Sequence, residues 1–231
     1  MIRWNAQGSY VVAFSTRRGG VSNGPFASLN LGLLTDDEPA NVEENRRRLC
    51  AAVGADPDRL ALNRQVHAAT VNRAEPGRRD RPGDGLWTDE PGLPLLKVTA
   101  DCLPIALVRT NGVPALAVLH AGRAGLLEGI AEAGAAALGG RLAAVIGPGI
   151  GPCCYEVSPE IRERYRARFG RTVVRAHNLD LWAAAEGALR AAGVSSVERT
   201  DVCTACNPGD FFSHRRDGRV TGRQGVIAYL A

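Results

Sequence analysis

The sequence predicts an α+β protein built as a single domain over residues 1–231. Short apolar runs rich in Val, Leu, Ile and Ala are mixed irregularly with longer helix-like segments. This order lacks the repeating strand–helix–strand period of a doubly wound sheet, so it favours layers of sheet and helix. A chain of 231 residues is long enough for one sizeable hydrophobic core, or at most two small ones.

Apolar runs bounded by Gly, Pro or charged residues are predicted as strands. They cover Tyr10–Phe14, Leu62–Val66, Leu95–Thr99, Ile105–Val108, Ala115–Leu119, Ala143–Ile146 and Val226–Leu230. Longer runs with start signals such as Ser158 and Asp180, and glycines as stop signals, are predicted as helices. They cover Asn41–Val53, Ala124–Leu138, Pro159–Phe169 and Leu181–Ala191. The Pro/Gly/Arg-rich stretch from Pro76 to Gly85 is predicted as an exposed loop.

Composition limits the possible functions. Apolar residues make up 45% of the chain, and no run approaches the roughly 20 apolar residues of a membrane span. The N-terminal residues lack the pattern of a signal peptide, so a cytoplasmic protein is expected, with its six cysteines mostly reduced. The adjacent Cys153 and Cys154 are expected to be buried thiols and not a strained disulfide.

The basic residues are almost all arginine, and Lys97 is the single lysine. A net charge of +4, spread along the chain with few aromatic residues, gives no sign of a nucleic-acid-binding arm. Arginine binds phosphate and carboxylate oxygens in a bidentate manner, so some of these residues are candidates for anion binding. No nucleic-acid or membrane partner is expected, and the chain is expected to be a monomer or a homodimer.

The most informative residues are His67, Cys102 and His120, each at or beside the end of a predicted strand. Two imidazoles and one thiolate bind Zn²⁺ and leave a fourth tetrahedral position open, which is typical of a catalytic metal site. Such an ion lowers the pKa of water to about 7. Asp101 precedes Cys102 and is predicted either to hydrogen-bond a ligand imidazole or to cap a turn.

A second possible metal or redox motif is the pair Cys203 and Cys206. A structural zinc site needs four closed ligands, and no second Cys-x-x-Cys pair completes the set. Asn207-Pro208-Gly209 follows and favours a loop, which argues against a redox motif at a helix start. The glycine-rich segment 147–152 lacks the Gly-Lys-Ser/Thr ending of a phosphate-binding loop, so it is interpreted as a turn after a strand.

The chain resembles the YfiH-like or laccase-domain family, also described as multicopper polyphenol oxidases and now regarded as purine nucleoside phosphorylases. The matching stretches run nearly from end to end of the sequence. They include Thr16–Ser22, Ser28–Gly32, Asn45-Arg46, Gln65–His67, Gly83–Thr88, Thr99–Pro104, His120–Gly122, Ile146–Val157, Asp180-Leu181, Cys203-Thr204, Phe212–Gly218 and Thr221–Arg223. The sequence departs from the family pattern where Arg123 and Ala124 replace a Trp-Arg pair and where His214 replaces a common Tyr.

The resemblance implies helices flanking two packed sheets, in an α/β/β/α arrangement. It implies a zinc-dependent purine nucleoside phosphorylase acting on adenosine, inosine and possibly guanosine and methylthioadenosine, with adenosine deaminase activity. His67, Cys102 and His120 are the implied metal ligands and, with Asp101, the catalytic residues. Arginines beside glycine-containing turns are candidates to bind phosphate or ribose, and the residues assigned to the substrate and phosphate are Arg17, Asn30, Arg216 and Arg223.

Two other functions fit some of these observations. A polyphenol oxidase using one Cu²⁺ ion in place of zinc is possible, because Cu²⁺ binds most nitrogen sites more tightly than Zn²⁺. A multicopper enzyme is disfavoured because the chain has four His and one Met, which is Met1. The second alternative is a scaffold without enzymatic activity.

Overall fold

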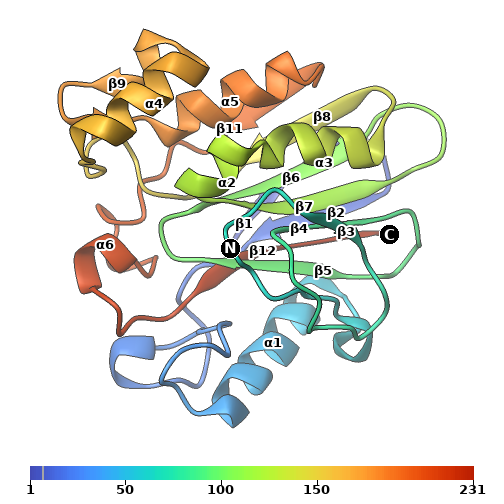
Figure 1. Ribbon diagram of the computed structural model, residues 1–231. Helices are drawn as coiled ribbons and strands as arrows, with labels where there is room; N and C mark the ends of the chain where they lie inside the picture. The colour runs from blue at the N-terminus through green and yellow to red at the C-terminus, as the bar shows by residue number, and fades with distance from the viewer. Residues whose placement is uncertain (7) are drawn as a thin grey trace.

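Two β-sheets packed face to face form the centre of the molecule (Figure 1). The structure is a computed structural model and describes residues 1–6 and 8–231. The six-stranded sheet has the order β11-β8-β6-β7-β4-β3, and the four-stranded sheet has the order β1-β2-β12-β5. A two-stranded hairpin, β9-β10, lies outside both sheets. The strands are β1 (Ile2–Trp4), β2 (Tyr10–Phe14), β3 (Val71–Arg73), β4 (Gly85–Thr88), β5 (Leu95–Thr99), β6 (Leu103–Arg109), β7 (Leu116–Ala121), β8 (Leu142–Ile146), β9 (Val174–Arg175), β10 (Asn178–Leu179), β11 (Ser196–Arg199) and β12 (Gln224–Leu230).

Helices cover the outer faces of both sheets (Figure 1). The longest helix lies against the four-stranded sheet, and most of the others gather over the six-stranded sheet. The helices are α1 (Pro39–Val53), α2 (Arg123–Glu128), α3 (Ile130–Leu138), α4 (Pro159–Phe169), α5 (Leu181–Ala191) and the single turn α6 (His214–Asp217), with 3₁₀ turns at Gly24–Phe26, Pro57–Arg59 and Arg171–Val173.

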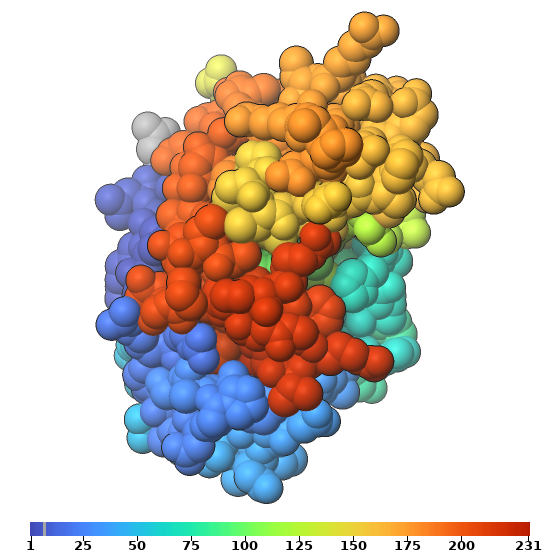
Figure 2. All heavy atoms as spheres, turned by 90° about the vertical axis from the view of Figure 1, so that its left-hand side faces the viewer, coloured from blue at the N-terminus to red at the C-terminus, as the bar shows by residue number. Residues whose placement is uncertain are grey.

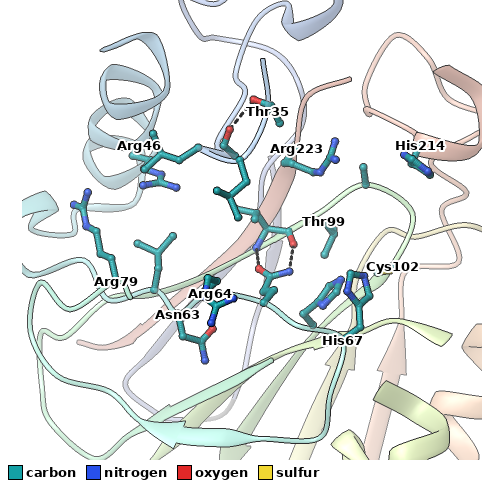
Figure 3. A pocket seen from close by; sticks show the side chains of 18 of the residues that line it. Thr35, Arg46, Asn63, Arg64, His67, Arg79, Thr99, Cys102, His214 and Arg223 are labelled. Carbon is teal, nitrogen blue, oxygen red and sulfur yellow. Dashed lines mark hydrogen bonds between the residues drawn. The ribbon is translucent and has the colours of Figure 1, made fainter. Parts of the chain in front are cut away.

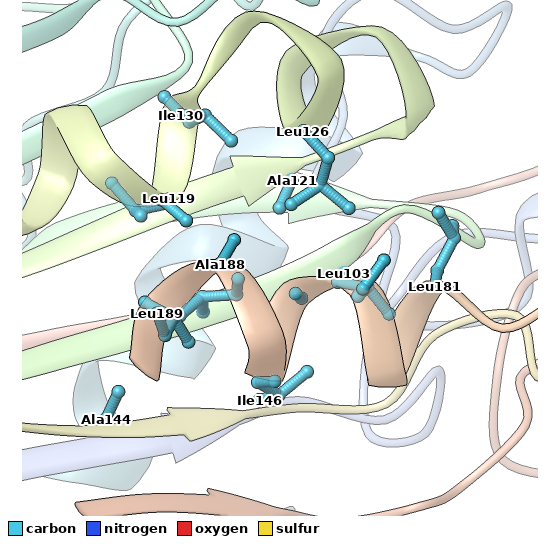
Figure 4. Close-up of a cluster of buried hydrophobic side chains, with 14 of the residues drawn as sticks. Leu103, Leu119, Ala121, Leu126, Ile130, Ala144, Ile146, Leu181, Ala188 and Leu189 are labelled. Carbon is cyan, nitrogen blue, oxygen red and sulfur yellow. The ribbon is translucent and has the colours of Figure 1, made fainter. Parts of the chain in front are cut away.

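Three clusters of buried apolar side chains fill the spaces between these layers. Figure 4 shows the cluster between the six-stranded sheet and the helices, where Leu103 and Leu119 meet Leu126, Ile130 and Leu189. A second cluster fills the space between the two sheets, and a third lies between the four-stranded sheet and α1. This sequence of layers is the α/β/β/α arrangement, so the predicted fold class is confirmed.

Most predicted elements are confirmed with shifts of one or two residues at their ends, but two differ. The segment Leu62–Val66 is not a strand; only isolated bridges occur there, between Ala61 and Leu95 and between Arg64 and Pro82. The helix predicted over residues 124–138 is two helices, because Gly129 has a φ of 96° and ends α2 before α3 begins.

The register of the central strands places Cys102 and His120 near each other. In the antiparallel pair β6–β7, Pro104 lies opposite His120 and Leu103 lies opposite Ala121. Cys102 directly precedes Leu103, so the start of β6 and the end of β7 bring Cys102 and His120 to the same sheet edge. Over residues 1–6 and 8–231, no helix has the length and apolar character that crossing a membrane requires.

Candidate metal centre

The structure brings His67, Cys102 and His120 together at the edge of the six-stranded sheet. Their ligand atoms all lie within 4.8 Å of one another. The two imidazole rings meet edge to face, with ring centroids 4.9 Å apart and an angle of 76° between the planes. Among the described residues no fourth His, Cys or carboxylate joins this group, so an ion held there keeps an open coordination position.

Gly122 allows this close approach. A Cβ atom built on Gly122 would lie 2.9 Å from the Cys102 Sγ and 3.3 Å from the His67 Cδ2. Both distances are shorter than ordinary van der Waals contacts, and backbone and ligands would have to move apart to make room. The small residue two positions after His120 is therefore required for the geometry of the cluster.

Asp84 positions both histidines. Its Oδ1 lies 2.7 Å from the Nδ1 of His120, and its Oδ2 accepts hydrogen bonds from the amides of Val66 and Ala68, at 3.0 and 2.9 Å. These two amides flank His67, which has a φ of 61°, a region that non-glycine residues rarely adopt. One fully buried carboxylate therefore holds the strained loop of His67 and the ring of His120 at once.

The electrostatics of Asp84 fix the tautomer of its histidine partner. Burial alone would raise the pKa of Asp84, but the hydrogen bonds from His120, Ala68 and Val66 outweigh it and lower the pKa to about 2. The ionised carboxylate requires the proton of His120 on Nδ1, and the lone pair of Nε2 is then available for a metal. Sequence reasoning missed Asp84 in this role.

Lys97 supports the same loop from inside the protein. Its side chain is fully buried, and its Nζ donates to the carbonyl of Gly83 at 3.3 Å. Burial lowers the pKa of Lys97 to about 7, and the charge of Asp84 opposes part of that shift. The single lysine of the chain is thus part of the buried support of the metal cluster.

Asp101 does not pair with a ligand imidazole, which corrects the first of the two roles considered for it. Its Oδ1 accepts a hydrogen bond from Thr204 Oγ1 and its Oδ2 accepts one from the amide of Arg215, both at 2.6 Å. Its backbone φ is 87°. Asp101 therefore ties the turn before Cys102 to two loops of the C-terminal part, as a capping residue does.

Two cavities meet at the cluster, sharing His67, Ala100, Cys102 and His214. The larger has a volume of about 680 Å³, and its lining includes residues 32–35, residues 62–65 and the end of β5. Figure 3 shows His67 and Cys102 on one side of it and Arg46 and Arg79 on the opposite side, toward α1. Its wall includes the apolar residues Leu33, Leu34, Leu62 and Val98.

The smaller cavity has a volume of about 400 Å³ and is lined by Asp101, Arg123, Tyr155 and Arg215. Arg215 stacks on Tyr155 with 5.0 Å between guanidinium carbon and ring centroid, and it donates to the carbonyl of Glu156. The hydrogen bonds among the described residues leave the Arg123 guanidinium unengaged, while Tyr165 Oη fixes its backbone carbonyl at 2.7 Å. This hollow can accept an anion.

Two of the four predicted substrate residues have structural partners instead. Arg216 pairs with Asp217 at 2.6 Å and donates to the carbonyls of Thr204, Ala205 and Phe211. Arg17 donates to carbonyls at 2.8 and 3.0 Å and stacks on Phe212. Neither side chain lines either cavity, so this geometry favours a role in holding loops together.

The other two predicted residues lie together near the larger cavity. Asn30 is fully buried and lies outside both cavities; its Oδ1 accepts from the amides of Gly32 and Arg223, and its Nδ2 donates to Asp37 and Thr35. Arg223 lines the larger cavity. Asn30 therefore positions the chain that carries Arg223.

Sequence reasoning missed Arg123 and Arg215 as wall residues. Arg123 stands where the family pattern has Trp, and that departure was a usable signal. Arg215 is adjacent to Arg216 in the same motif. Both lie in the single turn α6, and it is Arg215 that lines the cavity.

Known proteins are similar to this chain over almost its whole length. The family described as Multi-copper polyphenol oxidoreductase laccase matches residues 11–231. A purine nucleoside phosphorylase of Pseudomonas aeruginosa is 38% identical over 238 residues, covering 98% of this chain and 96% of that protein. The purine nucleoside phosphorylase YlmD of Geobacillus stearothermophilus is 36% identical over 248 residues, covering 95% and 89% of the two chains.

Solved structures show the same fold. The hypothetical protein YfiH of Bacillus licheniformis superposes with a TM-score of 0.89 at 29% identity, covering 96% of this chain and 93% of that one. The structure of YlmD from Geobacillus stearothermophilus gives a TM-score of 0.88 at 34% identity, covering 96% and 92% of the two chains.

Proposed function

The chain belongs to the multi-copper polyphenol oxidoreductase laccase family, and from this premise we propose that it is a zinc-dependent purine nucleoside phosphorylase. The observation that carries the proposal is the position of the His67–Cys102–His120 cluster at the junction of two unlike cavities. One is large and partly apolar, and the other is small and basic. Two adjoining cavities can hold a nucleoside and phosphate side by side at the cluster.

The donor set fits one zinc ion. Two imidazole nitrogens and one sulfur are the ligands that zinc prefers, and the hydrogen bond from His120 to Asp84 is the kind of support that ligand histidines receive. When bound, such an ion supplies Lewis-acid chemistry. Several coppers do not fit, because the remaining histidines, His177 and His214, do not join the cluster within the described chain.

The larger cavity suits the nucleoside. Its volume of about 680 Å³ lies within the range of small-molecule sites, and its leucines and Val98 provide apolar contact for a purine ring. Polar groups at its two ends, Arg46 and Arg79 on one side and His67 on the other, can orient the molecule along the cavity. We assign adenosine and inosine as substrates of this cavity, with guanosine and methylthioadenosine as further candidates.

The smaller cavity suits the phosphate. In phosphorolysis an oxygen of phosphate forms a bond to C1′ of the ribose, the C1′–N9 bond breaks, and the purine leaves with the bonding electron pair. Arg123 and Arg215 provide positive charge beside the junction, so they bind phosphate and direct it toward the ribose. Positioning of this kind, rather than proton transfer by the chain, carries the reaction.

Adenosine deaminase activity is a second reaction of the same proposed centre. Deamination replaces the amino group at C6 of adenine by the oxygen of a water molecule and releases ammonia. All three residues of the cluster line the cavity assigned to the purine, and metal-assisted attack of water is suited to this step.

A panel of purine nucleosides, incubated with and without phosphate and analysed by chromatography, tests the proposal. We expect free base and ribose 1-phosphate only when phosphate is present, and inosine from adenosine in either case. Metal analysis of the same sample, with His120→Ala and the exposed His177→Ala as matched control, links activity to the cluster. Equal release of base without phosphate would show a hydrolase and contradict the proposal.

The family description favours one alternative, a polyphenol oxidase that uses a single copper ion in the cluster. Phenol oxidation that tracks copper content, with no phosphate-dependent release of base, would select this alternative over the phosphorylase.

A further inference from the structure

A second group of metal-ligating residues lies apart from the first. The Sγ atoms of Cys153, Cys154, Cys203 and Cys206 all lie within 4.8 Å of one another. The Cys206 Sγ is 3.5 Å from that of Cys153 and 3.3 Å from that of Cys154. The adjacent Cys153-Cys154 pair thus completes the set that the Cys203/Cys206 motif lacks in the sequence. The expectation of buried thiols is wrong for this pair, because Cys153 is exposed and Cys154 is half-buried.

The backbone brings these residues together from two distant loops. Gly149 and Cys203 form an isolated parallel bridge, which continues the pairing of β8 with β11 beyond the sheet. A turn follows on each side, over residues 152–154 and over residues 204–206. Figure 2 shows the yellow segment near residue 150 against the orange-red segment near residue 205 on one face of the molecule. The cluster is therefore a consequence of strand pairing.

We propose that these four cysteines form a closed, structural Zn²⁺ site. Four thiolates at a Zn–S distance of about 2.3 Å lie roughly 3.8 Å apart at the corners of a tetrahedron. The sulfur separations here fall around that value, and they need adjustments of less than about one ångström. An iron–sulfur cluster also uses four cysteines, but its core of several atoms holds the thiolates farther apart.

A disulfide is the main competing arrangement, and the geometry disfavours it. All four cysteines are free thiols, and the 3.3 Å between the Sγ atoms of Cys154 and Cys206 far exceeds the S–S bond of about 2.05 Å. Cys206 is also nearly equidistant from Cys153 and Cys154, so neither is selected as its partner. One disulfide would leave two unpaired thiols in the same place.

Neighbouring polar groups suit a charged zinc–thiolate centre. Binding of Zn²⁺ to four thiols releases four protons and leaves a net charge of −2. The amide of Gly151 donates to the Cys203 Sγ at 3.3 Å, as amides do around bound thiolates. Arg216, which is paired with Asp217, donates to the carbonyls of Thr204 and Ala205 and so fixes the turn between Cys203 and Cys206.

The site would fasten the loops that surround the smaller cavity. Tyr155, next to Cys154, is part of the cavity wall, and Thr204, next to Cys203, donates to Asp101. None of the four cysteines lines either cavity, and none belongs to the His67–Cys102–His120 cluster. This proposal therefore does not depend on the proposed enzymatic function.

Zinc content of the full chain, purified without added metal, tests the site. We expect two zinc ions per wild-type chain, one in Cys206→Ser, one in Cys102→Ser and none in the double variant. Cys50→Ser, which replaces a thiol in α1 far from both clusters, is the control and keeps two. Cys206 is exposed, so its replacement leaves the folded core intact.

Two measurements on the same samples complete the test. Cys102→Ser loaded with Co²⁺ is expected to show the sulfur-to-metal absorption of four thiolates, which Cys206→Ser in the same background loses. A mass that is lower by two hydrogens, with Cys206 in a disulfide peptide, would overturn the proposal. So would zinc content unchanged by Cys206→Ser. Absence of phosphorolysis with two zinc ions present would contradict only the enzymatic proposal.

Discussion

The two cysteine-containing clusters differ in where they lie and in what surrounds them. His67, Cys102 and His120 come from the ends of central strands and a loop held by a buried carboxylate, and two cavities meet there. Cys153, Cys154, Cys203 and Cys206 come from two surface turns, and neither cavity touches them. Three ligands beside a cavity suit chemistry, whereas four ligands without one suit only the joining of loops.

The two clusters also differ in how their ligand side chains are held in place. The first cluster is held in place by the hydrogen bonds of Asp84 and by the space that the missing side chain of Gly122 leaves. In the second cluster, the Gly151 amide donates to the Cys203 Sγ, and Cys153 and Cys206 are exposed. We therefore expect removal of metal to affect activity at the first cluster and stability at the second.

The largest effect is expected for Cys102→Ser. Loss of the thiolate removes a charged ligand from the open centre, so phosphorolysis should fall on the order of 10²- to 10³-fold, the range for loss of a group that stabilises a transition state. The melting temperature should change little, because a core of this size does not need a metal to fold. Activity and thermal unfolding, measured beside Cys50→Ser, check both statements.

If Cys102→Ala retains zinc at the first cluster, Cys102 is not a required ligand, and the contrast between the two clusters is wrong.

Asp84→Asn is expected to have the next largest effect. An amide cannot offer two acceptor oxygens, so it cannot serve both the His120 ring and the amides beside His67. Loss of such support costs roughly 10- to 100-fold in metal affinity or activity. Competition with a chromophoric chelator measures the affinity. Asp180→Asn, which replaces a buried carboxylate that caps α5 and lines neither cavity, is the matched control.

If Asp84→Asn and wild type bind zinc with equal affinity in this competition, the carboxylate is not needed to position the ligands.

Arg123→Ala and Arg216→Ala sharpen the assignment of the phosphate cavity. Loss of a charged hydrogen-bonding contact costs on the order of 1.5–3 kcal/mol, so Arg123→Ala should raise the KM for phosphate roughly ten- to hundred-fold. Arg216, the residue predicted from the motif, is engaged with Asp217 and carbonyl groups, so its loss should change that KM less than about three-fold and lower the melting temperature. Phosphate kinetics of both variants decide between them.

If Arg216→Ala raises the phosphate KM more than Arg123→Ala does, the motif-based interpretation is right and the cavity-based one is wrong.

Cys206→Ser is expected to have the smallest effect on activity, within about two-fold, with its main effect on stability. The chain between Cys154 and Cys203 is about 50 residues long, and closing a loop of this length contributes on the order of 2–4 kcal/mol in a chain-entropy estimate. For a domain of this size that corresponds to a fall of roughly 5–15 °C in the melting temperature. Thermal unfolding with and without a zinc chelator measures it.

An equal fall in the melting temperature on chelator treatment of wild type and Cys206→Ser would contradict a stabilising ion at the second cluster.

The sequence predicts the first cluster better than the second for a physical reason. Cys102 and His120 lie at the ends of apolar runs that are true strands, so their meeting follows from antiparallel pairing. The place of Asp84 depends on a hydrogen bond across 36 residues, and no local pattern marks it. His67 belongs to a loop where a strand was predicted. The run Leu62–Val66 carries three polar residues at positions 63–65 and forms only isolated bridges, at Ala61 and Arg64.

The second cluster is hidden from sequence reasoning because a missed strand creates it. Residues Ser196–Arg199 form β11, yet their exposed and half-buried side chains do not make an apolar run. Its parallel pairing with β8 extends to the bridge between Gly149 and Cys203. Spacing within either cysteine pair carries no information about this long-range contact.

The junction of two cavities at one cluster has a consequence for kinetics. A nucleoside assigned to one cavity and phosphate assigned to the other do not compete for the same volume. Either can bind to the free enzyme, so a random sequential mechanism is expected rather than an obligatory order. Double-reciprocal plots for the two substrates should intersect, and a phosphate analogue should inhibit competitively against phosphate and noncompetitively against the nucleoside.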